Sequence, residues 1–299
     1  MKKNKYFIIT VDTEGDDLWN YIPGTEVQTK NACFIQPFQD ICNKYGFKPV
    51  YLTNYEMLKS EEYIDFAKKN RDECEIGLHL HAWNNPPFYE LEHKYSGNAY
   101  LIEYPKNVMR EKFANLYNLY VEKFGHKPIS HRSGRWAMNQ DYFDILEEYG
   151  LKVDCSYTPG IFWKTDCGQS VPSGSDYSDE DLHVSMVGNI MEIPMSVQNC
   201  RFLTTGSWKH VAKCLIAGQL TWVRTSMSRV ADIMGLMRVL DKRKDLDYIE
   251  FMIHSSELMP GGSPYFKTRE DVKRHLAYIN EVFKYASTLG YKGVTLEEY

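Results

Sequence analysis

Short apolar runs alternate along the chain with longer segments in which apolar residues recur every three or four positions. The short runs predict buried strands at residues 6–11, 46–53, 75–83, 129–132, 153–157, 190–195 and 249–254. The longer segments predict helices at residues 34–45, 55–70, 108–124, 141–149 and 222–240, with Gly125 and Gly150 ending two of them. This alternation predicts an α/β fold, a parallel sheet with helices outside it.

The segment at about 160–185 interrupts this rhythm because it is rich in Gly, Ser, Asp and Pro. We expect a long inserted loop there, and its aromatic pair Phe162 and Trp163 favours a role facing a substrate. The chain has 299 residues, of which 43% are apolar, so it can bury a large core. Because α/β barrels of this length often form one domain, we expect a single domain over residues 1–299.

Two histidines, His79 and His81, lie two positions apart in the apolar run 75–83. In a strand, side chains at positions i and i+2 point to the same face, so two imidazoles there can reach one ion. Neutral imidazole is the commonest metal ligand and suits zinc. The pair indicates a metal site, with histidines hydrogen-bonded inside a core strand as the alternative.

Carboxylates begin where the first apolar run ends, with Asp12 and Glu14 and then Asp16 and Asp17. Ligands of parallel α/β folds bind at the carboxyl ends of strands, so acids at this position are candidates for chemistry. If the strand continues, Asp12 and Glu14 share a face, where two carboxylates need a cation or a shared proton. Asp16 and Asp17 fit an acidic turn better.

Two further clusters follow strands. Arg132 ends one short strand, and a positive side chain there can hold Asp12 ionised and oriented, with a surface arginine as the alternative. His254 ends the strand 249–254 beside a glycine-rich loop, where a general acid can work. The candidates for substrate contact are the neighbouring Trp83, Arg135 and Trp136.

Charge and cysteine usage exclude several classes. The net charge of -5, without an extended Lys/Arg block, argues against a nucleic-acid partner. Seven scattered cysteines without a Cys-x-x-Cys pair fit reduced thiols better than a disulfide framework. The apolar stretch near the N-terminus stops at Asp12, too short for a signal peptide or a bilayer span, so we expect a cytoplasmic protein without a transmembrane segment.

Five segments, in order along the chain, resemble the motifs of the NodB-type polysaccharide deacetylases, carbohydrate esterase family 4, and within it the branch linked to surface-polysaccharide biosynthesis. These segments are residues 10–15, 75–83, 132–135, 154–159 and 253–255, and residues 293–299 are similar to the strand and turn that end such barrels. The resemblance implies a distorted (β/α)7 barrel and the metal-dependent removal of an N- or O-acetyl group from a sugar.

The resemblance also implies roles for four residues. Asp12 falls at the position of the general base, Arg132 at the arginine that orients the base, and His254 at the general acid. His79 falls at the first metal-binding histidine.

Two positions depart from the family pattern. Thr13 stands where the family usually has a second Asp, and Trp83 stands where it has its second histidine. We infer that Glu14 and His81 replace these ligands, because each lies on the strand face of its partner ligand or base.

The expected cofactor is a divalent metal ion held by Glu14, His79 and His81, most suitably zinc, with cobalt, nickel or iron as alternatives. The expected partner is an acetylated sugar or glycan precursor, with Asp12 taking a proton from water and His254 protonating the leaving group. Two other functions stay open. One is a metal hydrolase of the amidohydrolase or PHP type, and the other is a catalytically inactive glycan-binding barrel.

Overall fold

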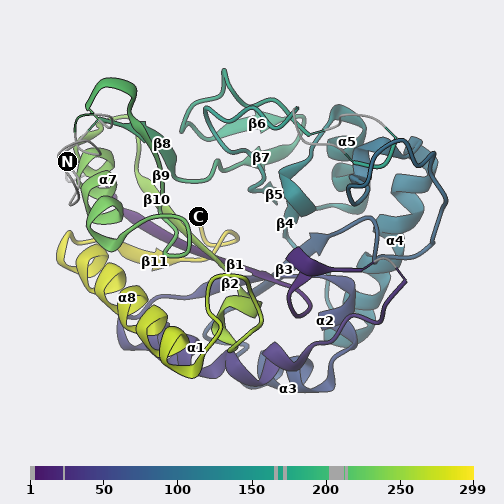
Figure 1. Cartoon of the computed structure of the whole chain (residues 1–299), viewed down its shortest axis with the longest axis horizontal. Coiled ribbons are helices and arrows are strands. Elements are labelled where there is room, and N and C mark those ends of the chain that lie inside the picture. Colours follow the sequence, from purple (N-terminus) through teal and green to yellow (C-terminus); the bar gives the residue numbers. More distant parts are fainter. Residues whose placement is uncertain (1–3, 23, 165–167, 171–173, 202–211, 213–214) are drawn as a thin grey trace.

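A computed structural model describes residues 4–22, 24–164, 168–170, 174–201, 212 and 215–299. Over these residues the chain forms a curled, half-barrel sheet with helices in an arc around its outer side (Figure 1). The strands run in the order β10-β1-β2-β3-β4-β5-β7-β6, and β11 pairs with the start of β1 beside β2. All neighbouring pairs in this order are parallel except β6 and β7. The parallel sheet and outer helices expected from the alternating pattern are therefore present.

Each predicted run overlaps a strand, but the strands in the runs 75–83, 153–157 and 190–195 end three residues early, and the strands at residues 185–187, 197–200 and 219–222 were not predicted. The strands are β1 Tyr6–Thr13, β2 Pro49–Thr53, β3 Glu75–Leu80, β4 Ser130–Ser133, β5 Val153–Asp154, β6 Ser185–Val187, β7 Ile190–Glu192, β8 Val197–Cys200, β9 Gln219–Trp222, β10 Tyr248–His254 and β11 Lys292–Val294. Strands β1, β2 and β10 are buried along nearly their whole length, as expected for a parallel sheet covered on both faces.

The α-helices are α1 Gln36–Lys44, α2 Tyr55–Lys59, α3 Glu61–Lys69, α4 Lys106–Phe124, α5 Gln140–Tyr149, α7 Val230–Lys242 and α8 Arg269–Thr288. The 3-10 helices are η1 Leu18–Asn20, η2 Lys30–Phe34, η3 Leu101–Glu103, η4 Gly134–Trp136 and η5 Ser255–Leu258. Gly125 and Gly150 end α4 and α5 in the left-handed conformation, as expected from the sequence, since glycine adopts it without a Cβ clash.

Two helix predictions need correction. The segment 55–70 forms two helices because Ser60 is extended and its hydroxyl caps α3 by accepting a hydrogen bond from the Tyr63 amide. The helix predicted at 222–240 begins only at Val230, because Trp222 ends β9, which pairs with β8.

Helix α8 was not among the predicted elements. Its signals are a capping box between Thr268 and Asp271 and buried residues at helical spacing, from Val272 to Ala286.

Loops fill the space between β7 and β10, whose strands are not paired in the described residues. The Tyr248 hydroxyl donates to the Pro194 carbonyl at 2.7 Å, and the Glu250 amide donates to the Ser196 hydroxyl at 2.9 Å. The Met252 amide donates to a carbonyl of the segment after β9, at 3.2 Å. The segments that follow β7 and β9 are thereby fixed against β10.

The loop expected at about 160–185 folds back on itself where it is described. Phe162 and Asp176 form an isolated antiparallel bridge, and the Trp163 amide donates to the Ser175 carbonyl at 2.9 Å. Residues 165–167 and 171–173 of this prediction lie outside the described residues.

Candidate metal centre and active-site cavity

Strand register brings the polar side chains together at the carboxyl edge of the sheet. In the parallel pair β1–β10, Asp12 lies opposite His254. In the pair β3–β4, His79 lies opposite Arg132. Because carboxyl ends of parallel strands share one edge of a sheet, residues far apart in the sequence meet there.

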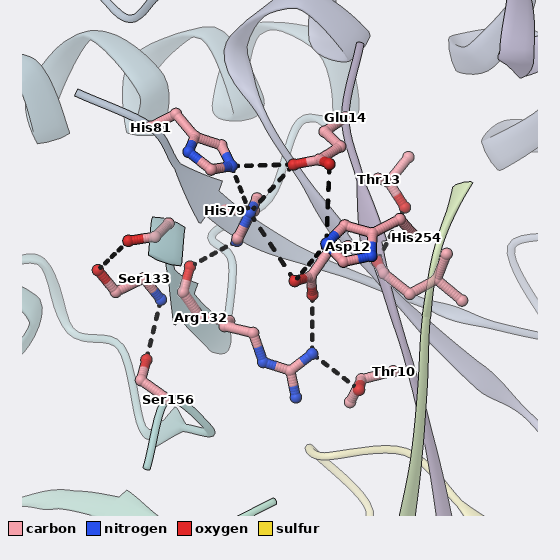
Figure 2. A network of polar contacts seen from close by, with 12 residues as sticks. Thr10, Asp12, Thr13, Glu14, His79, His81, Arg132, Ser133, Ser156 and His254 are labelled. Atoms are coloured by element: carbon pink, nitrogen blue, oxygen red, sulfur yellow. Dashed lines mark hydrogen bonds and ion pairs between the residues drawn. The ribbon is translucent and has the colours of Figure 1, made fainter. Parts of the chain in front are cut away.

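Three buried side chains converge at the end of β3. Glu14 Oε2 lies 2.9 Å from His81 Nε2 and 3.6 Å from His79 Nε2, and the two Nε2 atoms are 3.0 Å apart. Figure 2 shows the three groups pointing toward one another. Within the described part of the chain, these three form the single group of three His, Cys, Asp or Glu side chains whose ligand atoms could hold one metal ion.

The spacing of these atoms fits a zinc-type ion. Ligands at about 2.0–2.2 Å from a tetrahedral ion lie about 3.3–3.6 Å from one another. The separation of 3.6 Å falls in this range, and those of 2.9 and 3.0 Å are a few tenths of an ångström shorter. The Arg132 carbonyl lies 2.9 Å from His79 Nδ1, so that nitrogen donates to the carbonyl and leaves the Nε2 lone pair facing Glu14. A carboxylate and two imidazoles are also a ligand set that zinc commonly binds.

Electrostatics favours the protonation states that a metal needs at two of the three ligands; at His79 burial lowers the pKa, but Asp12 and Glu14 outweigh it and the net pKa is raised. Burial lowers the pKa of His81 to about 4, so its imidazole is neutral at neutral pH. Burial opposes ionisation of Glu14, but His254, His79 and His81 outweigh it and hold the pKa of this carboxyl far below its usual value. An ionised carboxylate beside a neutral imidazole suits metal binding.

Asp12 is anchored through one oxygen and open at the other. Arg132, which is fully buried, donates from Nη1 to Asp12 Oδ1 at 2.7 Å and to the Thr10 hydroxyl at 2.9 Å, and its Nη2 donates to Glu250. Burial raises the pKa of Asp12, but the Arg132 charge leads the opposing effects and the net pKa is lowered. Arg132 is therefore not a surface arginine, and Asp12 is an ionised group with a fixed orientation.

The open oxygen of Asp12 faces two histidines. Asp12 Oδ2 lies 3.9 Å from His79 Nε2 and 3.8 Å from His254 Nε2. His254 Nε2 is also 3.8 Å from Glu14 Oε1. These separations are longer than hydrogen bonds, so the carboxylates and His254 surround a small space beside the converging ligands (Figure 2).

Arg224 and Glu257, which sequence reasoning missed, lie next to the His254 nitrogen that faces away from Asp12. Arg224 Nη2 lies 2.8 Å from His254 Nδ1 and 2.6 Å from Glu257 Oε1, and Ser226 donates to the same carboxylate oxygen at 2.9 Å. Glu257 follows His254 by only three residues, so a carboxylate this near the candidate acid was a signal. Arg224 lies in a segment with no motif, and nothing in the sequence pointed to it.

A cavity of about 350 Å³ opens above these groups and is rich in tryptophan. The described tryptophans all line it, and they are Trp19, Trp83, Trp136, Trp163 and Trp222. The sixth, Trp208, lies outside the described residues. The rings of Trp136 and Trp163 are stacked, with centroids 5.2 Å apart and an interplanar angle of 17°.

The backbone next to this cavity is strained. Arg135 and Trp136 both have φ of 55°, the left-handed region that non-glycine residues rarely adopt. The Arg135 guanidinium lies 3.7 Å from the ring centroid of Tyr100 and donates to the Asn98 carbonyl at 2.7 Å. Such strain is common at functional sites, and here it directs both side chains toward the cavity.

The structure brings nearly all of the sequence-predicted site residues together. Those that line the cavity are Asp12, Glu14, His79, His81, Trp83, Arg135, Trp136 and His254. Arg132 does not line the cavity itself but donates a hydrogen bond to Asp12, which does.

Three other residues singled out in the sequence lie elsewhere. Asp16 accepts hydrogen bonds from the Lys30 and Asn31 amides, and Asp17 accepts from Asn20, as an acidic turn does. Of the aromatic pair in the long loop, Trp163 lines the cavity, whereas Phe162 is half exposed and does not.

No protein-family model and no curated protein matches the chain. Solved structures do. A protein named as a candidate cellobiose-phosphate cleavage protein from Enterococcus faecalis is similar with a TM-score of 0.54 and 14% identity, over 98% of this chain and 98% of that chain. The 4-alpha-glucanotransferase of Thermococcus litoralis has a TM-score of 0.51 and 12% identity. At these identities the two likenesses show a shared fold alone.

The match to the glucanotransferase covers 99% of this chain but only 38% of that protein. A family 4 carbohydrate esterase from Streptomyces lividans, in complex with acetate, is similar with a TM-score of 0.45 and 9% identity, over 98% of this chain and 93% of that chain.

No helix among the described residues has the length and apolar character needed to cross a bilayer.

Proposed function

We propose that this protein is a metal-dependent hydrolase that removes an acetyl group, N- or O-linked, from a sugar of a surface glycan or its precursor. The observation that carries the proposal is the placement of two proton-transfer groups beside one ligand set. Asp12 and His254 lie 3.8 Å apart, next to the convergence of Glu14, His79 and His81, on the floor of the tryptophan-lined cavity. The proposal includes a distorted (β/α)7 barrel as the scaffold.

Glu14, His79 and His81 would hold the metal ion, with zinc as the best match to one carboxylate and two imidazoles. When bound, such an ion lowers the pKa of a coordinated water and polarises a carbonyl group. The Arg132 carbonyl holds the His79 ring in the orientation that this role requires.

Asp12 acts as the general base. Its Oδ1 is fixed by Arg132, while its Oδ2 faces the space between His79 and His254 and accepts the proton of the attacking water. The lowered pKa keeps Asp12 ionised and ready to accept a proton at neutral pH.

His254 donates a proton to the leaving amine or alkoxide. A guanidinium group has only donors, so in the neutral ring Arg224 donates to the Nδ1 lone pair of His254 and the proton lies on Nε2. As the acid, His254 is the imidazolium with a proton on each nitrogen: Nε2 gives its proton to the leaving group, and the Nδ1 proton faces Glu257 Oε1 at 3.4 Å. Nε2 is the nitrogen that faces Asp12 across the cavity floor. Proton abstraction and proton donation therefore occur on two sides of the same space.

The tryptophans suit a sugar substrate. Flat aromatic rings pack against the apolar C–H faces of a sugar ring, and the ring N–H groups of Trp83 and Trp136, which have no partner among the described residues, can donate to its hydroxyls. A volume of about 350 Å³ accommodates a small ligand of this kind.

Acetate release tests the proposal. The purified protein is incubated with a panel of N-acetylated and O-acetylated saccharides, and acetate and bound metal are measured in parallel. We expect acetate release that a chelator abolishes and zinc restores. A metal-loaded protein that releases no acetate from any member of the panel contradicts the hydrolase.

A glycan-binding barrel without catalysis is the second candidate, favoured by the concentration of tryptophans in one cavity. Binding of the same saccharides without acetate release supports it. A hydrolase of the amidohydrolase or PHP type needs further His and Asp ligands at later strand ends, and the described residues offer one group of three.

A further inference from the structure

A second cavity has no role in the proposed reaction. It has a volume of about 370 Å³ and is lined by Tyr21, by residues of the segment 25–29, by the start of α2 and by the loop that follows β3. None of its lining residues lines the catalytic cavity. Its most informative lining residues are Glu56, Asn84 and Phe88.

Two polar side chains in this cavity are buried without partners. Asn84 is only 7% exposed, and neither its amide oxygen nor its amide nitrogen makes a hydrogen bond within the described part of the chain. Both carboxyl oxygens of Glu56 are likewise buried and unpartnered there. Buried polar atoms are nearly always hydrogen-bonded in native proteins, so four such atoms around one cavity indicate that something polar occupies it.

A neutral occupant fits these side chains. Burial raises the pKa of Glu56 to about 8, so at neutral pH this group is a carboxylic acid, which both donates and accepts hydrogen bonds. Asn84 also offers donors and an acceptor without charge. The charged residues at this cavity, Glu26 and Lys59, are exposed at its rim. Groups of this kind match hydroxyls rather than a metal ion or a phosphate.

Aromatic rings complete the lining. Phe88 is 76% exposed although it is a large apolar side chain, and Tyr21 and Tyr55 also line the cavity. An exposed ring next to buried hydrogen-bonding groups suits a ligand with one apolar face and several hydroxyls, which is the surface of a sugar ring.

A third cavity, of about 280 Å³, joins the other two. Tyr21 and Phe88 line both this cavity and the second one, and Trp83 lines both this cavity and the catalytic one. The three cavities therefore form a series, with Phe88 and Trp83 at the junctions.

We propose that the cavity lined by Asn84, Glu56 and Phe88 is a second carbohydrate-binding site, which takes a neutral sugar unit of the same glycan chain whose acetylated unit lies in the catalytic cavity. The connection to the acetylated unit rests on the function proposed above, whereas the binding of a sugar at Asn84 does not. The substrate is accordingly an oligosaccharide or polymer rather than a single acetylated sugar.

Binding as a function of chain length tests this site. The probes are N-acetylglucosamine and its β-1,4-linked oligomers of two to six units. Their affinities are measured by calorimetry on the full chain carrying Asp12→Asn, which slows turnover by about 10²-fold or more. We expect affinity to rise with length. Added Asn84→Ala or Phe88→Ala should lower the affinity of the longest oligomers about tenfold or more and leave N-acetylglucosamine unchanged.

Two controls make the result interpretable. Tyr95 is an exposed aromatic residue that lines none of the three cavities, so Tyr95→Ala should change no affinity. Glu56→Gln keeps the shape of the side chain and a donor and an acceptor, so it should retain most of the affinity that Asn84→Ala loses. Because Phe88 is largely exposed, Phe88→Ala should fold normally even if Asn84→Ala does not.

The remaining outcomes are distinct. Equal affinities of the background protein and its cavity variants at every length mean that the cavity holds only water, which overturns the proposal. Equal losses for the single sugar and the oligomers mean a site for a free sugar, which overturns its link to the substrate chain. Length-dependent binding that requires Phe88, together with no acetate release by the wild-type protein, supports the site and contradicts only the hydrolase.

Discussion

Arg224 and His254 are joined by a contact of 2.8 Å between the guanidinium Nη2 and the imidazole Nδ1, on the side of the ring that faces away from Asp12. Because the guanidinium can only donate, this contact places the proton of the neutral ring on Nε2, whereas Glu257 Oε1, 3.4 Å from Nδ1, can accept from Nδ1 when the ring is an imidazolium. Glu257, which is fully buried, accepts from the same Arg224 nitrogen at 2.6 Å and keeps it in place. The orientation of the proposed acid therefore depends on a residue outside every recognised motif.

Replacing this residue should affect turnover more than binding. We expect Arg224→Met to lower kcat between about 10- and 100-fold, the scale seen when a ligating histidine loses its orienting partner, and Arg224→Lys to restore part of it. Nitrogen-15 NMR of labelled histidine should show that the neutral His254 ring carries its proton on Nε2 in the wild-type protein. A wild-type signal with the proton on Nδ1, or equal changes in stability and activity in both variants, contradicts this role.

The histidine pair should determine metal binding. His79→Ala and His81→Ala should each remove most of the bound zinc and abolish turnover, because a site with three protein ligands rarely keeps its ion after losing one. His183→Ala is the matched control, since this histidine is half exposed and pairs with Asp181 and Asp245 at the surface. Full metal content and activity in either of the first two variants means that the histidine is structural.

Substitution of Asp12 should lower the rate, whereas substitution of Glu14 should weaken metal binding. Asp12→Asn should leave most of the metal in place and lower the rate by about 10²-fold or more, the usual scale for a lost proton-transfer group. Glu14→Gln should instead weaken metal binding, and Asp179→Asn, at an exposed position, should do neither. Metal analysis and kinetics check this, and the reverse pattern would exchange the roles of Asp12 and Glu14.

Glu56 should make stability fall as pH rises. Its folded-state pKa of about 8 lies above the unfolded value near 4.5, so between these pH values the native state holds a proton that the unfolded state releases. The stability that this protonated carboxyl contributes is full below about pH 4.5 and is lost as pH rises toward 8, by up to about 4 kcal/mol.

Glu56→Gln removes this titration. Urea unfolding at pH 5 and pH 8 should therefore show a smaller loss of stability in the variant than in the wild-type protein, with both proteins similar at pH 5. Identical pH dependence in the two proteins means that Glu56 is ionised in the native state.

The stacked tryptophans should contribute to substrate affinity. Trp136→Ala removes the ring that stacks on Trp163 and packs near Trp222, so we expect KM to rise about tenfold with a smaller change in kcat. The measurement is steady-state kinetics on the best saccharide of the panel. A fall in kcat with unchanged KM would instead assign Trp136 to the alignment of the reacting groups.

Much of the local architecture could be read from the sequence because it depends on neighbouring residues. The strands follow apolar runs, and Gly125 and Gly150 end helices as expected, because glycine is favoured where the backbone turns left-handed. His79 and His81 come together as their spacing of two residues suggested, although β3 ends at Leu80 and His81 lies just past the strand.

The tertiary structure alone decided how these pieces meet. The register of β1 against β10 places Asp12 opposite His254, and periodicity within either strand leaves that register undetermined. Arg224 reaches His254 only because the segment after β9 is fixed to β10, and the described tryptophans meet in one cavity although they come from separate segments. Periodicity and capping are local properties and can be read along the chain, whereas register and the packing of loops depend on long-range contacts that no single segment contains.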